Sequence, residues 1–206
     1  YTIGSSTHTA SGTYTDVFTT SNGCDSTVTT NLTVLPQFTI SVYATSSATI
    51  CSGSSVTLSL VGVASSTNTY QWNDASGAIS GATSSTYTTS TAGSYSLTVT
   101  NTNSCVATSN AVAVTVLTVS TPVSLSTSSI QLDRATMNWA TVTNANHYDI
   151  RMRVQGSAWS VLMSNIPSSY TSQTKTALSS STTYEWQIRA ACSNDRSSVS
   201  AWSSTP

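Results

Sequence analysis

Residues 93–99 decide the fold, because Gly93-Ser-Tyr95-Ser-Leu97-Thr-Val99 places a large apolar side chain at every second position and a small hydroxyl between. Val56-Thr-Leu58-Ser-Leu60 repeats the pattern. A period of two predicts strands with one buried face. No window shows apolar residues at i, i+3, i+4 and i+7 with helix caps. The sequence therefore predicts an all-β chain.

The composition supports this interpretation and excludes several classes of function. Only 13 of the 206 residues are charged, whereas 82 are Ser or Thr, and the net charge is −1. Thr favours strands through its β-branched carbon. Recurrent apolar runs argue against disorder. Nucleic-acid binding needs several clustered Lys or Arg residues, and a membrane helix needs about 18 uninterrupted apolar residues. We expect neither nucleic-acid binding nor membrane insertion.

The chain contains an internal repeat at a constant offset of 81 residues. Gly12-Thr-Tyr14 falls on Gly93-Ser-Tyr95, and Cys24 falls on Cys105. In both copies a turn that contains Asn and Cys leads into a closing Val- and Thr-rich strand, predicted over 28–35 and 111–117. Each copy is therefore predicted to end a module with a hairpin.

The start of the chain has a counterpart in the second module. Tyr1-Thr-Ile3 corresponds to Val56-Thr-Leu58, with Tyr1 in the place of Val56. This predicts that the first module is cut in mid-strand and is shorter than the second. It lacks a counterpart of the stretch from Tyr70 to Thr91, and the position of that deletion stays open.

Three modules are predicted, with boundaries near Pro36 and near 118–122. They cover residues 1–36, 37–117 and 118–206. The first two contain three acidic residues, Asp16, Asp25 and Asp74, and no Lys or Arg, whereas the third contains six basic and four acidic residues. This difference in charge indicates that the third module has a different origin.

The first two modules resemble known bacterial repeats. Tyr70-Gln-Trp72, the stretch from Ile79 to Tyr87 and Ala92-Gly-Ser-Tyr95 resemble an immunoglobulin-like or PKD-like repeat with a core Trp. Residues 12–27 are similar to a shorter repeat from the same kinds of protein. Such repeats occur in large surface proteins exported by the type IX secretion system. The resemblance implies an immunoglobulin-like sandwich preceded by the C-terminal part of a truncated one.

The third module resembles fibronectin type III. The matching stretches are Ala135-Thr-Met137-Asn-Trp139, residues 148–154, and Leu178 six residues before Tyr184. In that family the last pair implies a tyrosine corner, in which the Tyr hydroxyl bonds the backbone upstream. The expected architecture is thus a tandem of β-sandwich modules.

The four cysteines fit no metal-binding spacing, so we expect disulfides instead of zinc. Cys51 and Cys105 flank strands of one module and are predicted to be bonded. By the repeat, the partner of Cys24 would lie about five positions before Tyr1, so Cys24 is expected to be unpaired within these residues. Cys192 has no internal partner in this scheme and is either a half-buried thiol or bonded to a flanking segment. The pairing implies an oxidising, extracellular setting.

No catalytic, metal or cofactor site is predicted. His147, Asp149 and Arg151 share the outer face of one strand, which indicates a solvated charge set. His8 takes the place of Thr89 and is expected at an exposed strand position. The remaining acidic residues are scattered over three modules, which does not suit a pair of catalytic carboxylates. The stretches 21–25 and 194–195 supply too few oxygens for calcium.

For a few residues the sequence allows either a function in modification or binding, or an ordinary structural position. Asp25-Ser-Thr27 resembles a bacterial O-glycosylation signal, which would modify Ser26, although an ordinary turn also explains it. The sequon at Asn31 lies on a predicted strand and is expected to be idle. Trp159 and Trp202 are candidates for stacking on sugars, with packing in the module as the alternative.

The leading hypothesis is a non-catalytic structural and adhesive segment of a large secreted bacterial surface or fibre protein. Its expected partners are neighbouring modules of the same or another copy, and surface glycans or proteins. One alternative is a set of accessory modules from a secreted hydrolase, and another is the subunit of a self-assembling filament. Residues 1–36 are too few to cover a core, so we expect an upstream strand or a strand of a neighbouring chain to complete them.

Overall fold

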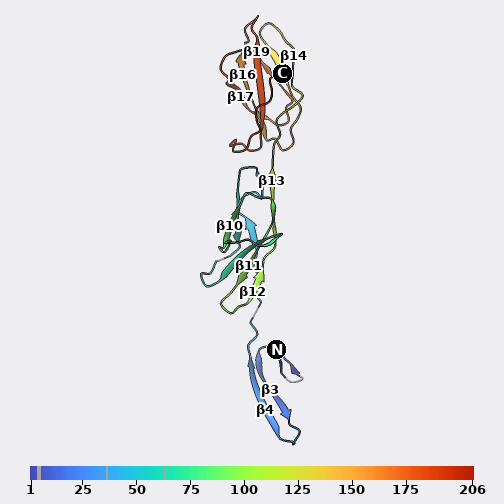
Figure 1. The fold of residues 1–206 in the computed structure, drawn as a ribbon, viewed down its shortest axis with the longest axis vertical. Coiled ribbons are helices and arrows are strands. Elements are labelled where there is room, and N and C mark those ends of the chain that lie inside the picture. The colour runs from blue at the N-terminus through green and yellow to red at the C-terminus, as the bar shows by residue number, and fades with distance from the viewer. Residues whose placement is uncertain (4–5, 36, 63) are drawn as a thin grey trace. The chain divides into compact units, whose positions relative to one another are not determined.

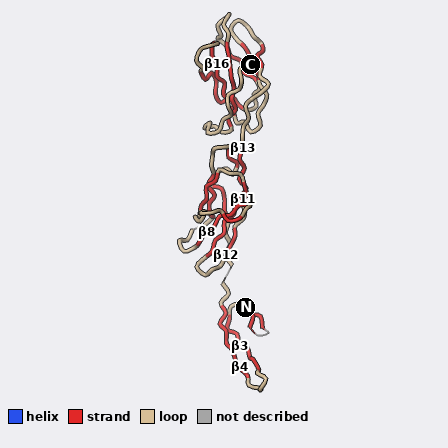
Figure 2. Tube along the Cα trace, in the orientation of Figure 1, coloured by secondary structure: helices blue, strands red, loops and turns tan. Residues whose placement is uncertain are grey.

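The computed structural model describes residues 1–3, 6–35, 37–62 and 64–206, and among them it contains strands and no helices (Figures 1 and 2). No helix that could cross a membrane is present in these residues. The chain forms two compact units, Tyr1–Thr39 and Ile40–Pro206. Pro36, where a boundary is predicted, lies outside the described residues. The boundary predicted near 118–122 falls inside the second unit and stays a prediction.

The first unit has four strands in two antiparallel pairs: β1 (Thr2–Ile3), β2 (Ser6–Thr7), β3 (Gly12–Thr19) and β4 (Asp25–Leu32). β3 and β4 pair along all eight residues without a register shift. His8 stacks on Tyr14 with ring centroids 3.8 Å apart, and its Nε2 lies 3.4 Å from Asp16 Oδ2. His8 is thus half-buried and lies after β2, so its prediction as an exposed strand residue is wrong.

Residues 40–117 of the second unit form two facing sheets. Their strands are β5 (Val42–Ala44), β6 (Thr49–Cys51), β7 (Val56–Leu60), β8 (Thr69–Asp74), β9 (Gly77–Ala78), β10 (Thr86–Thr89), β11 (Gly93–Thr100), β12 (Val106–Thr108) and β13 (Val112–Leu117). One sheet has the order β10-β7-β5, and the other has β6-β13-β11-β8-β9 with β12 also paired to β11. Alternate residues of β7, β8 and β11 point between the sheets, including Leu58, Trp72 and Leu97, all fully buried.

Residues 118–206 form two further sheets. The strands are β14 (Ser126–Ser128), β15 (Ala135–Asn138), β16 (His147–Val154), β17 (Ser160–Pro167), β18 (Ser172–Lys175) and β19 (Tyr184–Ala191), with sheet orders β14-β15-β18 and β17-β16-β19. The core between them includes Met137, Tyr148, Ile150, Trp186 and Ile188. This is the inward set of the alternation in β15, β16 and β19. The predicted all-β sandwich architecture is confirmed.

Tyr184 anchors the connection that precedes β19. Its hydroxyl accepts a hydrogen bond of 3.0 Å from the backbone N–H of Ser179, which lowers the pKa of Tyr184. Leu178 packs against the buried core beside it. This is the contact that the fibronectin resemblance implies for Leu178 and Tyr184.

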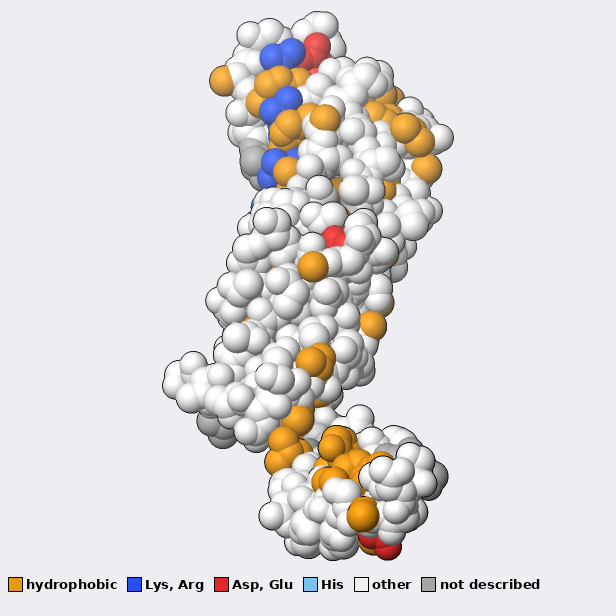
Figure 3. Space-filling view, turned by 60° about the horizontal axis from the view of Figure 1, so that its bottom comes forward, with side chains coloured by type: hydrophobic (Ala, Val, Ile, Leu, Met, Phe, Trp, Pro, Cys, Tyr) orange, Lys and Arg blue, Asp and Glu red, His pale blue; other side chains and the backbone are white. Residues whose placement is uncertain are grey.

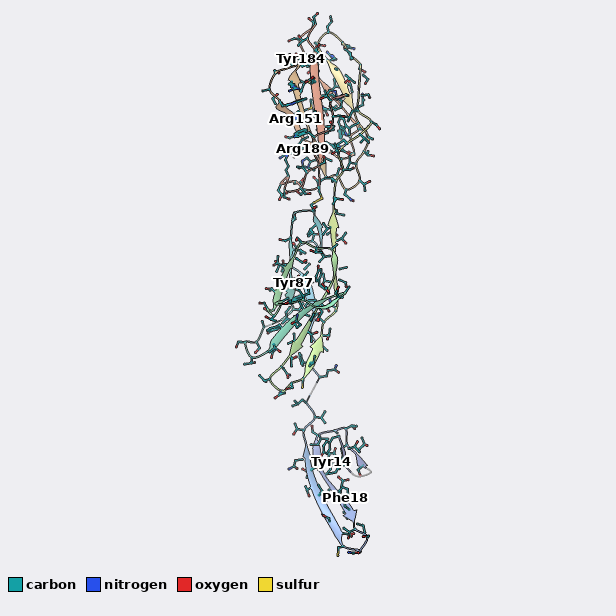
Figure 4. All side chains as sticks on the ribbon, viewed as in Figure 1. Tyr14, Phe18, Tyr87, Arg151, Tyr184 and Arg189 are labelled. Carbon is teal, nitrogen blue, oxygen red and sulfur yellow. A yellow bond between two sulfur atoms is a disulfide. The ribbon has the colours of Figure 1, made fainter. Side chains whose placement is uncertain are left out.

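The repeat at offset 81 extends to single hydrogen bonds. β3 and β11 have equivalent bounds, and Tyr14 and Tyr95 each donate their hydroxyl to the carbonyl four residues earlier, at 3.0 and 2.9 Å. A Cβ added at Gly12 or at Gly93 would lie 3.3 Å from the same Tyr ring. The glycine is therefore required because the ring lies across it. Figure 4 labels Tyr14 in the first unit.

Candidate functional site: a disulfide-linked joint and an arginine–tryptophan ladder

The second unit contains one disulfide, and it differs from the predicted one. Cys51 is bonded to Cys192, with Cα atoms 5.9 Å apart, whereas Cys105 and Cys24 are free thiols. The predicted Cys51–Cys105 bond is therefore wrong, as is the expectation that Cys192 has no partner within the chain. Cys24 is exposed.

The direction of the strands explains this correction. β6 runs parallel to β13 and places Cys51 opposite Leu117, at the end of the sandwich where residue 118 begins. β11 runs antiparallel to β13, so the turn with Cys105 follows β11 at the opposite end. Eight residues of β11 span about 27 Å, whereas a disulfide needs Cα atoms within about 7 Å. Cys192 follows β19, beside the start of the third predicted module.

A short loop after Cys192 completes the joint. The Oγ of Ser54 lies 3.3 Å from the Oγ of Ser197, and Ser197 O lies near Gly53. Asp195 holds this loop, because its carboxylate accepts hydrogen bonds from the Ser193 hydroxyl and the Ser197 N–H. These bonds lower the pKa of Asp195 to about 2. The joint therefore consists of one covalent bond and a hydrogen-bonded loop.

The outer face of the β17-β16-β19 sheet carries a ladder of alternating Arg and Trp side chains. The Arg151 guanidinium lies 4.7 Å from the ring centroid of Trp159 and 4.5 Å from that of Trp202. Arg153 extends the ladder at 4.3 Å from Trp159, and Arg189 extends it at 4.7 Å from Trp202. We call these five residues the ladder. Each such contact contributes about 0.5 to 1 kcal/mol at a partly exposed site.

Strand register builds the ladder. Arg151 lies opposite Gln187, and Arg153 lies opposite Glu185, so each guanidinium donates to an acceptor on the neighbouring strand. Figure 4 shows Arg151 and Arg189 on adjoining strands, and Figure 3 shows basic and hydrophobic side chains alternating along one line of the surface. Trp159 and Trp202 are half-buried within this stack. Packing, the alternative to sugar stacking, accounts for these contacts.

A buried charge cluster continues from the ladder. Asp149 is 1% exposed and accepts hydrogen bonds of 3.0 to 3.2 Å from Arg189 and Arg196. Burial alone would raise the pKa of Asp149, but the bonds from Arg196 and Arg189 outweigh it, and the pKa is lowered. The prediction that His147, Asp149 and Arg151 share one face of the strand is confirmed. The prediction that this face is solvated is wrong for His147 and Asp149, which are both buried.

His147 is 3% exposed and lies beside this cluster. Its Nδ1 is 3.1 Å from Asn146 Oδ1, while its Nε2 has no hydrogen-bond partner among the described residues and lies 3.8 Å from Asp149 Oδ1. Burial lowers the pKa of His147, and it outweighs the attraction of the Asp149 carboxylate. Burial therefore favours the neutral form of His147.

One cavity is lined by residues of the third predicted module. It has a volume of about 610 Å³ and is floored by Met137, Met152 and Trp186. Arg134 is the charged residue in its lining, and this side chain pairs with its neighbour Asp133. The other titratable side chain in the lining is Tyr184, whose hydroxyl accepts the Ser179 hydrogen bond described above. Among the described residues, no group of three His, Cys, Asp or Glu side chains could hold a metal ion.

The other sequence candidates lie apart from the joint and the ladder. Ser26 is exposed on β4 opposite Phe18, so its modification stays a prediction. Asn31 is also exposed on β4 and accepts a hydrogen bond from the Thr13 hydroxyl. Neither the joint nor the ladder is predicted by the sequence pattern of single strands. Alternating Arg residues at 151 and 153, with Trp residues nearby, are the signal that indicates the ladder.

Comparison with known proteins shows the fold alone. No protein-family model matches the chain, and no curated protein matches it. The crystal structure of domains A168–A170 from titin matches with a TM-score of 0.54 and 14% identity, covering 91% of this chain and 71% of that chain. Chicken CNTN1 FN1–FN3 domains match at 0.41 and 13%, covering 94% and 76%. A two-domain fibronectin type III segment of chicken tenascin matches at 0.38 and 15%, covering 72% and 89%. The match to the titin domains supports the all-β sandwich fold of the chain.

Proposed function

We propose that this chain is a non-catalytic, load-bearing spacer in a secreted bacterial surface protein. The observation that carries the proposal is the bond between Cys51 and Cys192, which joins the two sandwiches of the second unit covalently. Disulfides persist in oxidising compartments, which supports an extracellular location. The likeness of residues 12–27 to repeats of type IX-exported surface proteins supports a bacterial origin and that route of export.

The bond changes how a pulling force would pass through the chain. Force arriving from the N-terminal side reaches Cys51, crosses the two sulfur atoms and leaves from Cys192. The 140 residues from 52 to 191 lie inside the closed loop and carry no tension while the bond is intact. Such a segment keeps its length under load. The low charge of the surface and its many hydroxyl groups suit a spacer that avoids ionic attraction to its surroundings.

Single-molecule pulling of the 206-residue chain, oxidised and reduced, tests this proposal. Reduction should release the enclosed residues and lengthen the extended chain by about 500 Å. The matched control is a double variant, Cys24→Ser with Cys105→Ser, which removes the two free thiols and should retain the difference. Equal extended lengths before and after reduction would reject the load-bearing role. Labelling intact source cells with an antibody against this segment tests its surface location.

A further inference from the structure

The strands of the first unit correspond to β7 and β10–β13 of the second unit, without counterparts of β8 and β9. The register of β2 with β1 pairs Thr7 with Thr2 and Ser6 with Ile3, and His8 N–H donates to Tyr1 O. In the second unit, β10 pairs with β7 in the same order, with Thr88 opposite Thr57 and Tyr87 opposite Leu58. β2 therefore corresponds to β10 at the offset of 81, and β1 corresponds to β7 at an offset of 55.

The deletion falls between these two strands. In the second unit, 25 residues from 61 to 85 connect β7 to β10 and supply β8 and β9. In the first unit, two residues connect β1 to β2. No counterpart of β8 can therefore arise within this connection, and this conclusion does not depend on where the chain begins. This places the deletion that the repeat alone leaves open.

The deleted β8 is the strand that covers one edge of β11. β8 pairs antiparallel with β11 along five residues, from Thr69 opposite Thr100 to Asn73 opposite Ser96. The equivalent edge of β3 has no partner among the described residues, since β3 belongs to a sheet of two strands with β4. Phe18 is 37% exposed, whereas Val99 at the equivalent place is 1% exposed. Figures 3 and 4 show the exposed hydrophobic side chains of this unit and the position of Phe18.

Four residues present hydrogen-bonding groups along this open edge. Thr20 N–H donates to Cys24 O at 3.1 Å, and antiparallel pairs alternate between bonded and non-bonded residues from there. The residues whose backbone N–H and C=O point away from β4 are therefore Thr13, Thr15, Val17 and Thr19. The strand contains no Pro, no Lys and no bulge, which are among the features that protect an edge from pairing, and its one charged residue is Asp16.

We propose that this edge pairs with β3 of a second copy of the chain, antiparallel and centred on Thr15. A two-fold pairing centred on Asp16 would set the two carboxylates opposite each other, which is unfavourable. Centring on Thr15 places Tyr14 opposite Asp16 of the second copy. It also places Gly12 opposite Phe18 of the second copy, so that the Phe18 ring lies beside the Tyr14 ring that crosses Gly12. Seven residues, 12–18, pair in this register.

The two-fold symmetry makes this contact a closed dimer and not a growing polymer. The area is small, so we expect a weak dimer, with a Kd of about 100 μM. Each first unit contains Asp16 and Asp25 and no Lys or Arg, so the two copies repel each other weakly. Added salt screens this repulsion and should strengthen the dimer.

Sedimentation of the full 206-residue chain from about 10 μM to about 2 mM tests the proposal, with iodoacetamide present to block the free thiols. The key variant is Thr15→Pro, which removes an outward N–H from the open edge and should weaken the dimer at least about tenfold. The matched control is Thr29→Pro, because Thr29 lies directly opposite Thr15 and its N–H points to the other edge of the hairpin. This control should dimerise like the wild type.

Amide exchange of the wild-type chain provides a measurement that needs no variant. The amides of Thr13, Thr15 and Val17, which point to the open edge within residues 12–18, should gain protection as the protein concentration rises. The amides of Tyr14, Asp16 and Phe18, which bond to β4, should not. A chain that stays monomeric over the whole concentration range overturns the proposal. So does a dimer that Thr29→Pro and Thr15→Pro weaken equally. Neither result bears on the load-bearing role, which depends on Cys51 and Cys192.

Discussion

In each of the three predicted modules, one tyrosine hydroxyl forms a hydrogen bond with the backbone of the connection that precedes its strand. Tyr14 and Tyr95 donate to carbonyl groups, whereas Tyr184 accepts from an N–H. Each Tyr ring packs along its strand, and its hydroxyl forms a hydrogen bond with the backbone of the connection that precedes the strand. No charged side chain takes part in this bond. This suits a chain with few ionic residues, because a neutral hydrogen bond replaces an ion pair in fixing each connection.

The first prediction concerns Tyr184. Tyr184→Phe should lower the free energy of unfolding by about 1 kcal/mol, because the Ser179 N–H loses its acceptor. Urea unfolding followed by Trp fluorescence measures the change. Tyr170→Phe is the control, since Tyr170 is 53% exposed and should tolerate the change. Equal stability of the Tyr184 variant and the control would show that the Tyr184 bond contributes nothing.

The second prediction concerns pH and His147. Burial lowers the pKa of His147 in the folded chain, so the unfolded chain binds a proton more readily. The resulting stability is present above the unfolded pKa of about 6.5 and is lost as the pH falls through the lower folded pKa. The free energy of unfolding should therefore decrease between pH 7 and pH 5.

Replacing His147 with Gln should reduce this decrease, because Gln does not titrate. Asp149 acts at lower pH in the same direction, since its pKa is lowered and its stabilisation is lost on further acidification. Urea unfolding at pH 7, 6 and 5 for both proteins checks the effect. An identical pH dependence of the wild type and His147→Gln would refute the assignment to this side chain.

At the scale of elements, the repeated hairpin turn is one structure encoded by two sequences. Thr20 N–H bonds Cys24 O and Gly23 N–H bonds Thr20 O, and the same two bonds recur at Asn101, Cys105 and Ser104. Gly23 and Ser104 occupy the same position with φ of 75° and 59°. That left-handed conformation is easy for glycine and costly for serine.

The third prediction exchanges these two residues. Ser104→Gly should stabilise the second unit by about 1 kcal/mol, and Gly23→Ser should destabilise the first hairpin by a similar amount. Thermal unfolding measures the former, and amide exchange in β3 measures the latter. Ser94→Gly is the control, because glycine within a strand only adds backbone freedom and should destabilise. Destabilisation by Ser104→Gly would contradict the turn geometry.

The sequence predicted the strands well because alternation encodes them directly. Trp72, Leu97 and Tyr148 are buried on the faces that their period of two assigns. The predicted correspondence of Tyr1 with Val56 is also found in the strand pairing. The His8 N–H donates a hydrogen bond to Tyr1 O, and Thr89, the equivalent of His8, lies opposite Val56. Local pattern is sufficient for such features.

Features that depend on distant segments could not be predicted in this way. The period of two assigns His147 and Asp149 to the outer face, but it does not show that Arg189 and Arg196 cover that face. The prediction of a bond between Cys51 and Cys105 was wrong because it considered only that both residues flank strands. The direction of each strand decides at which end of the sandwich its cysteine lies. Sequence spacing alone does not contain that direction.

At the scale of the whole molecule, the bond between Cys51 and Cys192 determines how the second unit behaves as one body. The bond spans 141 positions of the chain, and closing a loop of that size stabilises the folded state by about 5 kcal/mol in the chain-entropy model. The ladder and the buried Asp149 cluster lie on strands β16 and β19, and β19 leads directly to Cys192. The covalent joint and the charged face thus share one strand.

The most direct test of this account is the disulfide map of the chain, and it is the fourth prediction. The 206-residue chain would be secreted into an oxidising medium, alkylated, digested with chymotrypsin without reduction and analysed by mass spectrometry. We expect a peptide pair joined through Cys51 and Cys192, with Cys24 and Cys105 carrying the alkyl label. A pair joined through Cys51 and Cys105, with Cys192 alkylated, would contradict it and remove the basis for the load-bearing joint.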